Sequence, residues 1–120
     1  ENFHRFNKSA SRMAMPEVAE DIFMGGLHKL LEIEKDWVKK GKGNTLYIRP
    51  FMIATGHGVI AAPSSEYRFM IILSPARAYY SGEVKVIIAE HFSRAASGGM
   101  GAAKAAGNDS TQFYPKKITK

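Results

Sequence analysis

The sequence predicts an α/β fold in which two helices precede three strands. Apolar residues recur at helical spacing in the first third of the chain, and runs rich in β-branched and aromatic residues follow. Glycine and proline separate these runs, as they do where turns join strands. With 120 residues, 45% hydrophobic and 23% charged, the chain has the composition of a globular domain of ordinary size. This composition argues against a mainly disordered chain.

Two helices are expected before the strands. Residues 2–13 are expected to form a short basic helix, and its apolar positions recur at i, i+3 and i+7: Phe3, Phe6 and Ala10. Pro16 suits the first position of a second helix. Acidic residues lie near the start of that helix and lysines near its end, which is the order that the helix dipole favours. Gly41 and Gly43 are expected to end it.

Three strands are expected after the helices, at Leu46–Ala54, Tyr67–Ser74 and Val84–Glu90. All three are rich in the β-branched and aromatic residues that sheets favour. Turn residues separate the first two, and Pro75 and Gly82 bracket the second connection.

The charge pattern narrows the class of partner. Seventeen Lys and Arg residues against eleven Asp and Glu residues give a net charge of +6, which favours an anionic partner such as nucleic acid, a phosphorylated ligand or a carboxylate. The basic residues are dispersed and not interleaved with aromatic residues, so no nucleic-acid partner is expected. No apolar run approaches the roughly 18 residues of a membrane span, so no membrane partner is expected either.

Several common types of site are not supported by the sequence. The chain has no cysteine, which excludes disulfides and thiolate chemistry and fits a reducing compartment. Its four histidines lack metal-binding spacing, so no metal is expected. Ser64 and Ser65 lack the glycine setting of a hydrolase nucleophile.

Tyr47 and Arg49 are candidate binding residues. They are two positions apart in an expected strand, so they point to the same face. A phenol beside a guanidinium can hold a carboxylate or a phosphate through charge-assisted hydrogen bonds. A solvent-facing side of the strand is the alternative interpretation.

Lys104 is a candidate nucleophile. It lies in the small-residue segment Gly98–Asn108 and is the only charged residue between Arg94 and Asp109. Close apolar packing would favour its neutral form, which a Schiff-base nucleophile requires. The glycines resemble a phosphate loop, but no Gly-Lys-Ser/Thr follows. The alternative is an exposed lysine on a small-residue helix.

Several segments stand in order along the chain: Asn2–Ala10, Leu46–Phe51, Phe69–Pro75 with Ala78-Tyr79-Tyr80, Arg94–Ala96 and Gly98–Asn108. Together they resemble branched-chain amino acid aminotransferases, which are pyridoxal-phosphate enzymes of fold type IV. The resemblance covers nearly the whole chain, whereas a complete member of the family is much longer. It therefore implies a partial fold type IV chain, with most of the small N-terminal domain in residues 1–80. Residues 81–120 would contain the interdomain connection and the start of the large cofactor-binding domain.

The resemblance also implies a reaction and roles for residues. The family transfers the amino group of leucine, isoleucine or valine to 2-oxoglutarate. Lys104 matches the lysine that binds pyridoxal 5'-phosphate and shuttles the proton, and Arg5 matches the arginine on the cofactor phosphate. Tyr47, Arg49 and Tyr79 match substrate-pocket residues, Arg49 serving the distal carboxylate of the glutamate-type substrate. A cytoplasmic homodimer, or another homo-oligomer, is expected.

Two positions depart from the family pattern. Asp109 replaces a tyrosine that hydrogen-bonds the phenolic oxygen of the cofactor, and a carboxylate there would repel a phenolate. Arg77 replaces a glycine in the interdomain connection. The carboxylate that pairs with the pyridine nitrogen would lie beyond Lys120. The isolated chain is therefore expected to be inactive and marginally stable, and a cofactor-free binding or interaction module is the alternative function.

Overall fold

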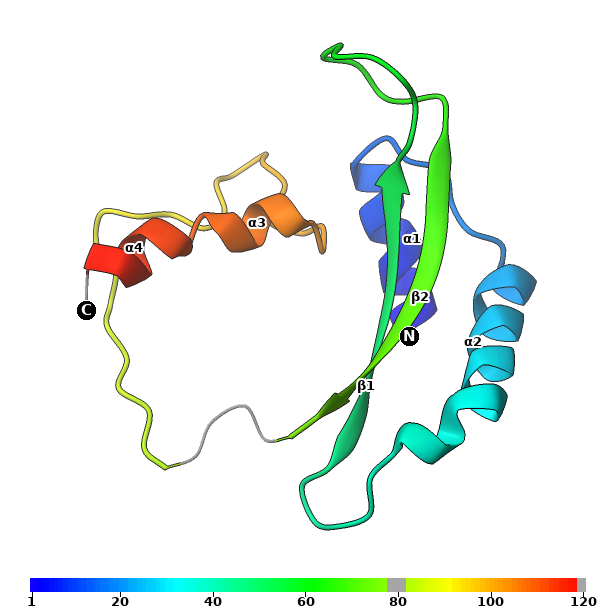
Figure 1. Cartoon of the computed structure of the whole chain (residues 1–120). Coiled ribbons are helices and arrows are strands. Elements are labelled where there is room, and N and C mark those ends of the chain that lie inside the picture. The colour runs from blue at the N-terminus through cyan, green and yellow to red at the C-terminus, as the bar shows by residue number, and fades with distance from the viewer. Residues whose placement is uncertain (78–81, 119–120) are drawn as a thin grey trace. The chain divides into compact units, whose positions relative to one another are not determined.

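The computed structural model describes residues 1–77 and 82–118. The elements in chain order are α1 (Asn2–Arg12), α2 (Glu20–Glu34), the 3₁₀ turn η1 (Lys35–Trp37), β1 (Thr45–Ala54), β2 (Tyr67–Ala76), α3 (Ala106–Ser110) and α4 (Phe113–Ile118) (Figure 1). They form two compact units, one of Val18–Glu83 and the other of Glu1–Glu17 with Val84–Lys120. This mixture of helix and sheet confirms the α/β fold class. The division into domains 1–80 and 81–120 concerns a longer protein and stays a prediction.

A β-hairpin is the centre of the unit Val18–Glu83, which we call the hairpin unit. β1 and β2 pair antiparallel, from Thr45 opposite Ala76 to Ala54 opposite Tyr67 (Figure 1). In the connection between the strands, the Ser64 hydroxyl accepts hydrogen bonds from the backbone N–H groups of Gly56 (3.2 Å) and Glu66 (3.1 Å). The first two predicted strands are thus confirmed, with boundaries shifted by no more than two residues.

Helix α2 packs on one face of this hairpin. Phe23 is buried and stacks on Phe69 of β2, with ring centroids 5.5 Å apart. The same face of the sheet carries alternate residues of both strands, with Leu46, Ile48 and Met52 on β1 and Phe69, Ile71 and Leu73 on β2. A two-stranded sheet is marginal by itself in water, so α2 supplies the apolar cover that the hairpin needs.

The second helix begins later than the sequence predicts. Pro16 is not its first residue, because α2 begins at Glu20 and Ala19 before it has extended backbone angles (φ −64°, ψ 146°). Residues 15–19 have no regular secondary structure, and the boundary between the two compact units falls among them, between Glu17 and Val18. The helix also ends earlier than predicted, at Glu34 with η1 continuing to Trp37. Gly41 and Gly43 do not end it; their positive φ angles turn the chain toward β1.

The predicted strand Val84–Glu90 is wrong. Its residues have no regular secondary structure, and Val86 and Ile88 are 85% and 88% exposed. A strand needs a neighbour for its backbone hydrogen bonds, and in the part of the chain that the structure describes the only sheet is the β1–β2 pair. Residue composition favours a strand here, but composition cannot supply the partner.

The other unit, which we call the lysine-loop unit, contains α1, α3, α4 and the segment before α3. Its buried residues are small or polar: Asn7, Ser9, Ala10, Ala103 and Asn108. The predicted first helix is confirmed as α1, and Ala10 of its predicted apolar stripe is 2% exposed. None of the helices in residues 1–77 and 82–118 is long and apolar enough to cross a membrane.

Candidate active site

The segment that carries Lys104 is tied to α1 by one hydroxyl group. The Ser9 hydroxyl accepts a hydrogen bond from the backbone N–H of Lys104 (2.9 Å) and donates one to the carbonyl oxygen of Arg5 (2.9 Å). Ser9 is 5% exposed, so its hydroxyl is largely shielded from water, and both bonds are partly buried. The backbone at Lys104 is therefore linked to the turn of α1 that carries Arg5, and two sequence-predicted site residues belong to one hydrogen-bonded network.

Two further side chains fix the segment before Lys104. The amide of Asn108, in α3, donates to the carbonyl oxygens of Met100 (2.8 Å) and Ala103 (2.7 Å). From α1, Arg12 Nη2 donates to the carbonyl oxygens of Gly98 (2.9 Å) and Gly99 (3.0 Å). These contacts supply partners for backbone groups that no regular element pairs.

Sequence reasoning did not find Ser9, Arg12 or Asn108 as residues that position the site. The hydrogen-bond partners of Ser9 and Arg12, both in α1, are 86 to 95 residues away in the sequence, so no local spacing reveals them. One feature of the sequence could have indicated Ser9: it is a polar residue next to Ala10, on the buried side of an amphipathic helix.

The glycines of this segment serve its own packing. Gly98 has φ +73°, a conformation that side chains with a Cβ rarely adopt. A Cβ added at Gly99 would lie 3.1 Å from the carbonyl oxygen of Ala96, and one at Gly101 would collide with the Ala95 side chain. The glycines thus allow the segment to fold back on residues 95 and 96.

The side chains of Lys104 and Arg5 are both exposed. The small residues around Lys104 pack the backbone, so the close apolar packing expected around its amine is not found. Arg5 Nη2 donates to Asn2 Oδ1 (2.9 Å). A guanidinium has five N–H donors, so this bond leaves others able to reach an anion.

Asp109, which departs from the family pattern, is paired with Arg94. Arg94 Nη2 lies 3.0 Å from Asp109 Oδ1, and the two side chains are 57% and 55% exposed. The pair offsets the negative charge of Asp109. It also joins α3 to the segment just before the glycines.

Tyr47 and Arg49 lie on one face of β1, as predicted, and it is the face away from Phe69. The Arg49 guanidinium carbon is 5.0 Å from the centroid of the Tyr47 ring, a cation–π contact. Both side chains are exposed, and by register Ser74 and Ile72 of β2 lie opposite them. The arrangement presents a cation beside a phenol. Tyr79 lies outside the described residues.

No group of three or more His, Asp or Glu side chains that could hold a metal ion occurs among the described residues. The described side chains also leave no buried nitrogen or oxygen atom without a hydrogen-bond partner. What they offer is exposed amine and guanidinium groups on a backbone held by side-chain hydrogen bonds. Such groups suit ligands with anionic or carbonyl chemistry.

Comparisons with known proteins identify relatives of the chain, although no family model matches it. The chain is 47% identical over 113 residues to a probable branched-chain-amino-acid aminotransferase of Staphylococcus epidermidis, covering 90% of the chain and 31% of the relative. It is 45% identical to branched-chain-amino-acid transaminase 1 of Bacillus subtilis, covering 90% of the chain and 32% of the relative. It is 42% identical to the branched-chain-amino-acid aminotransferase of Mycolicibacterium smegmatis, covering 89% of the chain and 30% of the relative. The chain thus spans about a third of the length of these relatives, and the resemblance read from the sequence is confirmed.

Proposed function

We propose that this chain is part of a branched-chain-amino-acid aminotransferase. It would carry the lysine that takes part in the transfer of the amino group, Lys104. The proposed substrates are leucine, isoleucine or valine and 2-oxoglutarate, and the proposed cofactor is pyridoxal 5'-phosphate. The observation that carries the proposal is the Ser9 hydroxyl, which hydrogen-bonds to the backbone of both Lys104 and Arg5. A cytoplasmic homo-oligomer remains part of the proposal.

The residues present fit the cofactor. The exposed amine of Lys104 would bind the carbonyl carbon of the cofactor, and the exposed guanidinium of Arg5 would bind the phosphate of the cofactor. When bound, pyridoxal phosphate supplies the electron sink for amino-group transfer. The part of Lys104 is to take up and return a proton at Nζ. Ser9, Arg12 and Asn108 would keep the backbone at Lys104 in place while its side chain moves.

Tyr47 and Arg49 are the proposed carboxylate-binding pair. Their contact at 5.0 Å holds the guanidinium beside the phenol, so an incoming carboxylate could accept hydrogen bonds from both. Apolar Ile72 lies opposite Arg49 in the register, which suits the aliphatic side chains of the other substrates. Tyr79 is proposed as a further pocket residue on the resemblance alone.

Asp109 does not argue against the cofactor. Its carboxylate is ion-paired with Arg94, so the repulsion expected between it and a phenolate is reduced. Arg94 would bring positive charge to the same locality.

The test of the proposal is covalent labelling. The whole enzyme is incubated with pyridoxal phosphate, reduced with borohydride and mapped by peptide mass spectrometry. We expect the pyridoxyl group on Lys104, and we expect Lys104→Arg to abolish it while the matched control Lys116→Arg does not. Labelling spread over Lys116 and Lys117, or none at all, would contradict the proposal, and the latter would favour a cofactor-free binding module.

The substrate assignment has its own test. In the whole enzyme, Arg49→Ala should remove a charge-assisted hydrogen bond worth about 1.5–3 kcal/mol, which lowers kcat/KM for 2-oxoglutarate by roughly 10- to 100-fold. The loss for leucine should be much smaller. Arg68→Ala, which removes another exposed arginine of the hairpin, is the matched control. Equal losses for both substrates would show that Arg49 is structural.

A further inference from the structure

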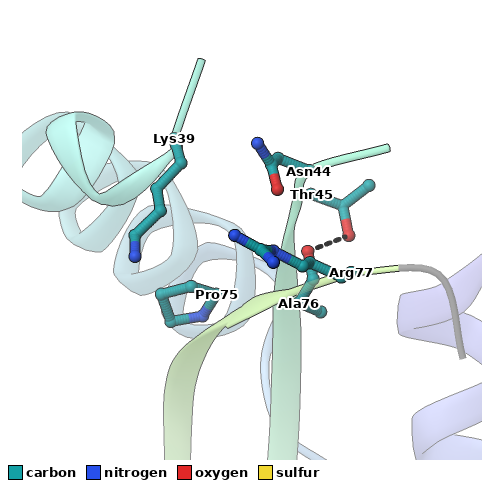
Figure 2. A pocket seen from close by; sticks show the side chains of 6 residues that line it. All are labelled: Lys39, Asn44, Thr45, Pro75, Ala76 and Arg77. Atoms are coloured by element: carbon teal, nitrogen blue, oxygen red, sulfur yellow. Dashed lines mark hydrogen bonds between the residues drawn. The ribbon is translucent and has the colours of Figure 1, made fainter. Parts of the chain in front are cut away.

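A hollow of about 230 Å³ lies in the hairpin unit where β1 begins and β2 ends (Figure 2). It is lined by Lys39, Asn44, Thr45, Pro75, Ala76 and Arg77. None of these residues belongs to the proposed cofactor or substrate sites. Arg77 is also one of the two positions that depart from the aminotransferase pattern.

The backbone around the hollow is held in place by hydrogen bonds. Thr45 is paired with Ala76 across the sheet, and its hydroxyl donates to the carbonyl oxygen of Ala76 (3.4 Å). Asn44 closes the preceding turn: its backbone N–H donates to the carbonyl oxygen of Gly41 (3.3 Å) and its amide to that of Lys40 (2.9 Å). Both rims of the hollow, and therefore the attachment points of its charged side chains, are set by these contacts.

Two cations share this hollow without a counter-charge. Lys39 and Arg77 are both exposed, and none of the six lining residues is acidic. Among the residues that the structure describes, neither cation forms an ion pair. Figure 2 shows the Arg77 guanidinium directed across the hollow toward the side from which Lys39 descends. Two like charges that point into one space repel each other, and an anion between them would relieve the repulsion.

We propose that this hollow binds a small, doubly charged oxyanion of the phosphate class, either free phosphate or the phosphate group of a larger molecule. Arg77 offers a planar fork of N–H donors and Lys39 a point charge, the two groups that proteins use for phosphate. A dianion can engage both cations at once, whereas a carboxylate has one charge for two partners. The site does not depend on the proposed aminotransferase function.

Equilibrium dialysis of the protein against radiolabelled inorganic phosphate tests this proposal, and it applies whether the chain is monomeric or associated. Arg77→Gly and Lys39→Ala should each weaken the binding of phosphate by about threefold or more, a modest factor because the site is exposed. Arg77→Lys, which keeps the charge but loses the fork, should lie in between. Lys42→Ala and Arg68→Ala remove cations outside the hollow and should change the Kd less than twofold.

Competition identifies the ligand class. Acetate should displace phosphate poorly, and glycerol phosphate should compete at least as well as inorganic phosphate. Tighter binding of glycerol phosphate would assign the site to organic phosphates, and equal binding to free phosphate. No measurable binding, equal competition by acetate, or equal weakening by Lys42→Ala would overturn the proposal. Circular dichroism of each variant verifies that the hairpin is still folded.

Discussion

The hairpin unit and the lysine-loop unit are held together by different kinds of interaction. In the hairpin unit, a ten-residue backbone ladder and the stacked pair Phe23–Phe69 bring the chain together. In the lysine-loop unit, side chains of Ser9, Arg12 and Asn108 bond to backbone groups of a segment that has no regular structure before α3. The first unit is organised by its backbone and apolar packing, the second by polar side chains, of which Ser9 and Asn108 are buried.

This difference suits the proposed roles. In β1, Tyr47 and Arg49 lie on one face because side chains alternate between the two faces of a strand. Most apolar substitutions elsewhere in the strand would preserve this alternation. The backbone at Lys104 follows no such repeat, so individual hydrogen bonds must specify it, and two of the side chains that make them, Ser9 and Asn108, are buried. We therefore expect the two units to respond to different substitutions.

The largest effect is expected in the hairpin unit. Phe23→Ala removes the one large side chain of α2 that is buried, which typically costs about 3–5 kcal/mol. A unit of this size has little stability to spare, so hydrogen exchange of the β1 and β2 amides should become fast while exchange of the Lys104 amide is unchanged. Ile22→Ala, at a neighbouring position that is 59% exposed, is the control. Equal effects of the two variants would mean that α2 does not pack as described.

A smaller effect is expected in the lysine-loop unit. Ser9→Ala leaves the backbone N–H of Lys104 without its acceptor, which costs about 1–3 kcal/mol when the group stays buried. Faster exchange of the Lys104 amide, with the hairpin amides unaffected, would show it. Ser11→Ala removes an exposed hydroxyl of the same helix that bonds to Glu17, and should cost less than about 0.5 kcal/mol. If Ser11→Ala matched Ser9→Ala, the Ser9 bonds would not be what holds this segment.

The smallest effect is expected for the ion pair Arg94–Asp109. Both side chains are more than half exposed, so a double-mutant cycle of Arg94→Ala and Asp109→Asn should give a coupling of about 0.2–1 kcal/mol. Salt screens exposed charges, and the Debye length falls from about 8 Å at physiological ionic strength to about 3 Å in 1 M salt. The coupling should therefore shrink in 1 M salt. A coupling above about 2 kcal/mol would place the pair among the interactions that organise the unit.

Local patterns determined a large part of this protein. The 3.6-residue repeat identified α1 and the body of α2, the runs of β-branched and aromatic residues identified β1 and β2, and alternation placed Tyr47 and Arg49 on one face. The motifs that stand in order along the chain, from Asn2–Ala10 to Gly98–Asn108, indicated the family. The helices, the strands and the shared face depend on residues close together in the chain, and the order of the motifs is read along it, so a sequence contains all of them directly.

Tertiary structure decided the rest, because the partners concerned are distant in the chain. Helix α2 starts at Glu20, just after the boundary between the two units at Glu17 and Val18, which no local pattern marks. Residues 84–90 have strand composition without a strand beside them, so they remain irregular. Ser9 became a residue of the candidate site only through a hydrogen bond to a backbone group 95 residues away. A hydrogen bond needs two groups within about 3 Å of each other, and only the folded chain brings such distant groups together.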